Sequence, residues 1–481
     1  MKKKYFYIYV QLFLFIFLLS YGNGVNAQEE SVEKILSFGQ FIARATADDT
    51  EFEQILIDEL TLKYQKDLKL PAKDLVLSVK QQHEFYLHQD RSSPDTTIGL
   101  SKLFPYAGTE LEMEYQVGAS RTSASESGTL SFTFAQPIAE NAFGRSTRLL
   151  DKIVGLEVDV AGHQIVEAYE DYLATIITAY YNWYEDYQNL LIGQSSYKEN
   201  LKLLDSMSER EKQKIALPID VNKVRLQVLS KKERLITLEE QYQNSWNAIC
   251  RIIRQKDDQT YIPQEEDPLT ELEGDFRVMF DRFTRDSRTF AILKKLEDKS
   301  SLEVARDADE LLPSINIIAG YEMSGDDYGI SNEDGFLYAG LSLEWPLFSD
   351  QVAKAEYEVS QVLNDKQKLS TLNTYHRLYM QLLNLFLQIE REQKLMATAQ
   401  ERITLAQSIL EDEKENYSFG KVTLNDYIQA FNDFDNNRFN KITHDSLYKK
   451  LLVEWLRLND LLVNKATGQP PVSSYFSKNM E

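Results

Sequence analysis

The distribution of proline is the strongest constraint that this sequence places on its fold. No proline lies between Pro137 and Pro218, and none lies between Pro346 and Pro470. Because proline in a helix interior costs about 3 kcal/mol, these gaps permit very long helices. Inside them, apolar residues recur at steps of three and four, the spacing of one helix face. A helix over 145–207 would extend for about 90 Å, a length that predicts a coiled coil or a helical barrel.

Each long helix is predicted to turn and return along itself. The first turn falls near Pro218, because proline suits the first turn of a helix, here predicted over 219–253. The second turn falls at Gly420, because glycine can end one helix in a left-handed conformation. Residues with capping side chains follow, so the second returning helix is predicted over 424–463. The sequence therefore predicts two long helical hairpins.

The segments that precede the long helices alternate apolar and polar residues, as strands do. Four segments show this pattern most clearly: TELEMEYQV (109–117), TLSFTFAQ (129–136), SINIIAGY (314–321) and LYAGLSLEW (337–345). Strands of about ten residues with one apolar and one polar face suit a membrane-spanning barrel. A soluble sheet that packs one face on a core has the same pattern, so the alternation leaves both structures open.

The order of strand, proline and long helix occurs twice, which predicts an internal duplication. LSFTFAQPIAEN and LSLEWPLFSD share an ending, so Pro137 and Pro346 are predicted at the joints where strand becomes helix. Four strands per chain are too few to close a barrel, and a bilayer excludes open sheet edges, so several chains are needed for closure. The predicted organisation is a signal peptide (1–27), a first repeat (28–265, with strands about 96–136 and long helices about 143–255), a second repeat (266–466, with strands about 313–345 and long helices about 350–463) and a C-terminal tail (467–481).

The start of the chain and its charge indicate where it acts. Three lysines, an apolar run and a final Val-Asn-Ala predict a secretory signal peptide cleaved between Ala27 and Gln28; a membrane anchor is the alternative. A net charge of −22 argues against nucleic-acid binding through a basic patch, and a passage lined by this chain would favour cations. With Cys250 as its one cysteine, the chain cannot form a disulfide framework.

The sequence contains no pattern that predicts catalysis. The five histidines are scattered without metal-ligand spacing, and no nucleophile elbow, phosphate loop or dinucleotide turn is present. We therefore expect no enzymatic activity, no catalytic residue, no cofactor and no metal site. Tyrosines at helical spacing between 169 and 187 are predicted to pack between helices rather than to form a ligand surface.

The ordered, duplicated set of segments resembles the TolC family of outer-membrane efflux proteins across essentially the whole mature chain. The resemblance is carried by LSFTFAQPIAENAFGRSTRLLDK, IITAYYNWYEDYQNL, LLPSINIIAGYE, GLSLEWPLFSD and YSFGKVTLNDYIQAFNDF. It implies a mainly α chain with a small β part, in which three copies form an α-helical barrel capped by a shared transmembrane β-barrel, four strands from each. It also implies a passive exit channel of a tripartite efflux or type I secretion system. Such a channel lies in outer-membrane lipid, extends into the periplasm, and meets a periplasmic adaptor and an inner-membrane transporter.

The resemblance assigns several residues to the periplasmic tip, where the channel closes. Tyr417 matches a tyrosine of the links that hold the entrance closed, and Gly420 lies in the matching turn. Asp426 matches a constriction aspartate, and Gln429 falls where a second aspartate is often found. Asp220 matches the corresponding aspartate in the first hairpin.

This chain also departs from the family pattern. Gln429 makes the constriction ring less acidic, and Val422 stands where the family has a closing arginine. Strand-like residues at about 74–104 precede TELEMEYQV, so the first strand pair is expected to be longer or to include an extra strand, whose role is not assigned. A different function, that of a periplasmic coiled-coil structural or adaptor protein, needs no lipid-facing strands and remains the alternative.

Overall fold

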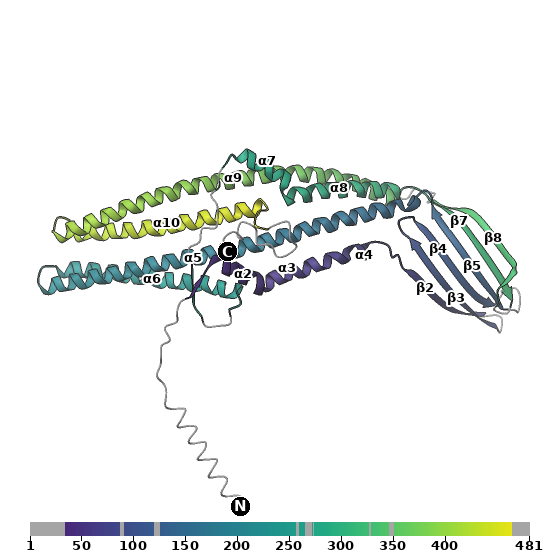
Figure 1. Ribbon diagram of the computed structural model, residues 1–481, viewed down its shortest axis with the longest axis horizontal. Coiled ribbons are helices and arrows are strands. Elements are labelled where there is room, and N and C mark those ends of the chain that lie inside the picture. The colour runs from purple at the N-terminus through teal and green to yellow at the C-terminus, as the bar shows by residue number, and fades with distance from the viewer. Residues whose placement is uncertain are drawn as a thin grey trace, which may run out of the picture.

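The chain forms an elongated rod with a sheet at one end and two helix turns at the other (Figure 1). The computed structural model describes residues 34–86, 91–119, 126–255, 259–264, 272, 274–326, 329–345 and 351–463. The predicted signal peptide with its cleavage site, the joint at Pro346 and the C-terminal tail lie outside these residues.

Two very long helical hairpins dominate the fold, as the proline-free stretches predict. Helices α5 (Arg145–Lys212) and α9 (Gln351–Ser418) have 68 residues each, so each extends for about 100 Å. The returning helices α6 (Pro218–Ile252) and α10 (Leu424–Leu458) have 35 residues each and cover only the half near the turns. Helix α5 packs on α6, α9 packs on α10, and α10 also packs on α5.

Shorter helices cover the halves of α5 and α9 that lie nearer the sheet (Figure 1). Side-chain caps define their starts: Ser37 forms a capping box with Gln40, and Ser287 accepts a hydrogen bond from the backbone of Phe290. A two-stranded parallel pairing joins β1 to β6. These elements are β1 (Lys34–Leu36), α2 (Phe38–Asp48), α3 (Thr50–Thr61), η1 (Leu62–Tyr64), α4 (Gln65–Lys69), β6 (Tyr261–Pro263), α7 (Phe276–Asp286) and α8 (Arg288–Asp309).

The main hydrophobic core forms a waist where the returning helices end. Side chains from α2, α5, α6, α7, α9 and α10 meet there around Trp183, which is fully buried. Tyr180 and Tyr181, from the tyrosine-rich segment of α5, pack against Phe38 of α2. The prediction that these tyrosines serve helix packing is confirmed.

One antiparallel sheet of six strands stands at the end of the rod, in the order β2-β3-β4-β5-β7-β8. Pairing of β5 with β7 joins the two repeats. The expected count of four strands is therefore wrong for this chain. Residues 75–86 and 91–104 form an antiparallel strand pair whose second strand pairs with β4, so the sequence-based expectation of one extra strand falls short by one. The strands are β2 (Leu75–Tyr86), β3 (Arg91–Phe104), β4 (Thr109–Ala119), β5 (Glu126–Pro137), β7 (Ser314–Asp326) and β8 (Ser331–Glu344).

Candidate functional site

The strand register gathers apolar side chains on one face of the sheet. Because side chains alternate along a strand, residues that are paired across strands share a face. Phe132 of β5 is paired with Met113 on one side and with Tyr321 on the other. The same row continues to both edges, and the next row on each side is also apolar except for Lys102 of β3. In order from β2 to β8 the row contains Leu77, Leu100, Met113, Phe132, Tyr321 and Leu337.

This apolar face is left uncovered by the described parts of the chain. Phe132 and Phe134, on an inner strand, are 41% and 37% exposed, and Leu337 on the edge strand β8 is 81% exposed. Large contiguous apolar surfaces on soluble monomers are rare and mark contact with a partner or a membrane. The face is therefore a candidate contact surface that extends across all six strands.

The opposite face of the sheet is polar and acidic. Glu114 of β4, Ser131 of β5 and Glu322 of β7 lie in one row on that face. Glu110 and Glu112 extend the carboxylates along β4, and Thr133 of β5 forms a 3.0 Å hydrogen bond with Tyr338 of β8. The sheet thus has one apolar face and one polar, acidic face.

The joint between sheet and helix in the first repeat is tightly constrained. Pro137 is the last residue of β5, and α5 begins at Arg145 after a short 3-10 turn, η2 (Ala142–Gly144). The backbone N–H of Asn141 donates to Asp309 Oδ2 at 3.0 Å, which anchors the turn to α8. Gly144 has a φ of 74°, and a Cβ there would lie 2.4 Å from the carbonyl oxygen of Tyr106. Only glycine fits this approach, which constrains the backbone between the sheet and α5.

A buried charge cluster ties the end of the second hairpin to the waist. Arg288 Nη2 lies 2.7 Å from a carboxylate oxygen of Glu170 and 3.0 Å from one of Asp460. The backbone N–H of Val463 donates to Glu170 Oε1 at 3.1 Å. Burial, which outweighs the attraction of Arg288, raises the pKa of Glu170 to about 7, and the Asp460 carboxylate adds to the rise.

The two helix turns pack against each other inside one chain. Met207 of α5, Val221 and Val224 of α6 and Leu424 of α10 form a small buried cluster. Asp220, in the first turn of α6, forms a 3.4 Å ion pair with Lys223 Nζ. The described contact between the tips is this apolar cluster.

Tyr417 spans the two hairpins at this cluster. Its hydroxyl donates to Met207 Sδ at 3.1 Å, and its ring stacks on Tyr427 with centroids 5.7 Å apart. The Arg210 guanidinium lies 5.6 Å from the centre of the Tyr417 ring, within the range of a cation–π contact. Burial raises the pKa of Tyr417. Val422 stands at the position where the family has a closing arginine. The cation–π contact of Arg210, from the other hairpin, with Tyr417 has no signal in the sequence.

Asp426 and Gln429 lie on the exposed first turns of α10. Asp426 Oδ2 accepts from the backbone N–H of Thr423 at 3.0 Å and from its hydroxyl at 2.7 Å, completing a capping box. These bonds hold the pKa of Asp426 below its usual range. Gln429 Nε2 donates to Asp433 Oδ1 at 3.0 Å. Gly420 has a φ of 71° in the turn before them, the left-handed conformation expected of a glycine there.

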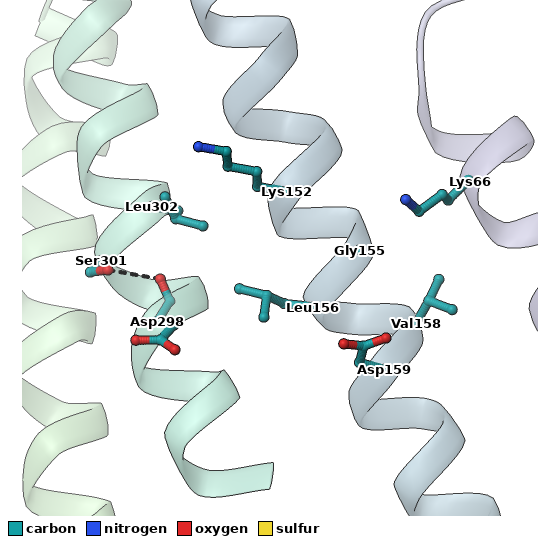
Figure 2. Close-up of a pocket in the computed structure, with 9 residues that line it drawn as sticks. All are labelled: Lys66, Lys152, Gly155, Leu156, Val158, Asp159, Asp298, Ser301 and Leu302. Carbon is teal, nitrogen blue, oxygen red and sulfur yellow. Dashed lines mark hydrogen bonds between the residues drawn. The ribbon is translucent and has the colours of Figure 1, made fainter. Parts of the chain in front are cut away.

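A side cavity of about 600 Å³ lies between α4, α5 and α8 (Figure 2). Figure 2 shows Lys152 and Lys66 on opposite sides of it, and Asp298 with Ser301 on α8. Its walls mix lysine, aspartate and aliphatic side chains, with no arrangement typical of a catalytic centre. Its lining residues are Lys66, Lys152, Gly155, Leu156, Val158, Asp159, Asp298, Ser301 and Leu302.

Within the part of the chain that the structure describes, no group of three or more histidine, cysteine, aspartate or glutamate side chains is placed to hold a metal ion. None of its helices combines the length and the apolar character needed to cross a membrane.

The same architecture occurs in solved structures. The outer membrane protein VceC of Vibrio cholerae matches with a TM-score of 0.65 and 12% identity, over 87% of this chain and 95% of that one. The CmeC outer membrane channel of Campylobacter jejuni matches with a TM-score of 0.65 and 12% identity, over 92% and 87%. The open-state MtrE outer membrane channel of Neisseria gonorrhoeae matches with a TM-score of 0.66 and 12% identity, over 88% of both chains. The chain has the outer-membrane channel fold.

The resemblance to the TolC family, read from the sequence, is confirmed at the level of this fold. The outer-membrane channel fold places the sheet at one end, the waist in the middle and the helix turns at the far end (Figure 1). No protein-family model and no curated protein matches the sequence. The likeness therefore lies in the architecture, which is retained although few residues are shared.

Proposed function

We propose that this chain is the outer-membrane exit channel of an export system, through which compounds or proteins pass from the periplasm to the outside without chemical change. The observation that carries the proposal is the uncovered apolar face of the six-stranded sheet. An uncovered apolar face of this kind suits contact with lipid, and the opposite, acidic face suits a water-filled lumen. The long hairpins then extend about 100 Å from the membrane into the periplasm.

Assembly from several copies follows from the physics of the sheet. A bilayer excludes open strand edges, and six strands are fewer than the eight of the smallest barrels. A homotrimer, the state that the family resemblance implies, would supply enough strands. Helix α9 supports it, because its exposed apolar residues need a neighbour to pack against: Val359, Val362, Leu363, Leu369 and Leu372.

The helix turns are proposed as the closed periplasmic entrance. In a threefold assembly Asp426 and Gln429 each form a ring, and a ring of carboxylates attracts cations. The contacts of Tyr417 with Met207 and Arg210 hold the two hairpins of each chain together at this level. Opening would separate these contacts.

Docking partners are proposed at the same end. Ile215 and Leu217, in the first turn, and Phe419, in the second, are exposed at the extreme tips of the hairpins. Exposed apolar residues on a tight turn suit a protein partner, here a periplasmic adaptor that joins the channel to an inner-membrane transporter. Whether the system exports small compounds or secretes proteins is decided by those partners.

The alternative, a periplasmic coiled-coil structural or adaptor protein, has the same hairpins but no use for an apolar sheet face. It predicts a protein that is monodisperse in buffer without detergent. Fractionation, mass photometry and planar-bilayer recording of the full chain separate the two functions. We expect a mature N-terminus at Gln28, recovery with the outer membrane, a trimer in detergent and stepwise conductance. A detergent-free monomer without conductance would refute the channel.

A further inference from the structure

The hairpin of β2 and β3 is an integral part of the sheet. Strand β2 is paired with β3 over all its 12 residues, from Leu75 opposite Lys102 to Tyr86 opposite Arg91. Strand β3 is paired in turn with β4, from Asp95 to Phe104. This continuous pairing makes the hairpin two further strands of the wall rather than a flap attached to it.

The hairpin also continues the division into two faces. Leu77 and Val79 of β2 are paired with Leu100 and Ile98 of β3, and all four lie on the apolar face. The intervening residues of β2, Ser78 and Lys80, point to the acidic face, as the alternation of a strand requires. A lipid-facing band therefore reaches the outermost strand on this side.

Among the described residues, β2 and β8 form the two edges of the sheet, and each has no partner strand on its outer side. Leu77 and Val79 are each 66% exposed, and Leu341 of β8 is 73% exposed, well above the values on the inner strand β5. Edge strands that must stay unpaired carry charges or proline, but residues 75–79 and 336–343 contain neither. Since neighbouring strands of the sheet alternate in direction, β2 and β8 are antiparallel to each other. They are suited to pair edge to edge.

We propose that β2 of one copy pairs with β8 of the next, so that three copies close a barrel of eighteen strands. This inference rests on the proposed trimeric channel and adds the identity of the joining strands and the size of the pore. The family resemblance implied four strands per chain, whereas this chain supplies six. Because diameter grows with strand number and barrels of 16–18 strands enclose an aqueous channel, the membrane end is a wide vestibule. Passage is then limited at the helix turns.

Cysteine cross-linking in the full chain tests the pairing. In a Cys250→Ser background, Val79→Cys on β2 is combined in turn with Leu337→Cys, Ala339→Cys and Leu341→Cys on β8. Paired strands lie about 4.8 Å apart, close enough for a disulfide. Oxidation in membranes is expected to convert much of the single-chain band into dimer and trimer bands for at least one combination.

Met113→Cys on β4 is the matched control. It lies on the same apolar face, but β2 and β3 would separate it from the neighbouring β8 by about 14 Å. It should not cross-link to any of the β8 cysteines. Electron cryomicroscopy of the trimer counts the strands directly and should show eighteen.

The outcomes separate the two levels of inference. Cross-links from Val79→Cys, with eighteen strands, support the pairing. Cross-links from Met113→Cys instead, or a trimer whose barrel has twelve strands, would overturn it and leave the channel itself standing. A monomer by mass photometry would overturn the proposed channel as well.

Discussion

A charge placed at the middle of the apolar face measures whether that face meets lipid. Phe132 lies near the centre of β5, between Met113 and Tyr321. An arginine at the bilayer midplane of a β-barrel costs about 2–4 kcal/mol. For Phe132→Arg this corresponds to a loss of roughly 30-fold to about 10³-fold in the equilibrium for insertion of each chain. A trimer would contain three such arginines, so the cost would apply once per chain.

Two matched variants isolate the face and the depth. Ser131→Arg, one residue away, points to the opposite face between Glu114 and Glu322, where a guanidinium gains two carboxylate neighbours. It is expected to insert like the parent. Leu343→Arg remains on the apolar face but lies at the helix end of β8, where the cost near the interface falls to about 0–1 kcal/mol.

The assay is insertion into lipid vesicles over a urea titration, followed by the yield of folded trimer. We expect Ser131→Arg and Leu343→Arg to give a yield of folded trimer close to that of the parent. The yield of Phe132→Arg should be far lower. If Phe132→Arg inserts as well as Ser131→Arg, the face does not contact lipid. If Leu343→Arg is as damaging as Phe132→Arg, the depth assigned to the strands is wrong.

The remaining predictions concern the tip and the waist. Tyr417→Phe and Arg210→Ala each remove one contact between the hairpins, worth about 1 kcal/mol, so channel opening in planar bilayers should rise by up to about fivefold; unchanged opening would place the gate elsewhere. Thr423→Ala removes the cap of α10, at about 1 kcal/mol, and should speed hydrogen exchange in its first turn; unchanged exchange would contradict the capping role. Because the folded-state pKa of Glu170, about 7, exceeds its ordinary value of 4.5, its contribution to stability is present below pH 4.5 and is lost as pH rises toward 7. Glu170→Gln should therefore reduce the difference in thermal stability between pH 5 and pH 8, and an unaltered difference would argue against the raised pKa.

The helical architecture could be predicted because its signals are local. The long helices follow from stretches without proline in which apolar residues have helical spacing. The turns follow from Pro218 and Gly420. The capping role of Asp426 was also readable, because Thr423 and an acidic residue three positions later form the pattern of a capping box. The family resemblance instead assigned Asp426 to a constriction of the channel.

Contacts between distant segments could not be predicted in the same way. Arg210 contacts Tyr417 because the turns of the two hairpins, from different repeats, lie at the same level. Neither residue departs from the helical pattern of its own segment, so neither is conspicuous in the sequence. Arg288, Glu170 and Asp460 come from three helices or their ends, and each looks like an ordinary surface charge in sequence. The sequence indicates strand-like residues before β4, but it does not define two full strands there, because Pro94 and the polar residues near it weaken the alternation.

The equal lengths of the corresponding helices restrict how such a chain can evolve. Adding seven residues to α9 would move its turn by about 10 Å, and α10 would need the same insertion to stay paired with it. The tips would then stand at different heights unless α5 and α6 gained matching segments, since the contacts of Tyr417 require both turns at one level. Four coordinated insertions are far rarer than one. The length of the helical rod is therefore expected to stay constant among the descendants of this chain.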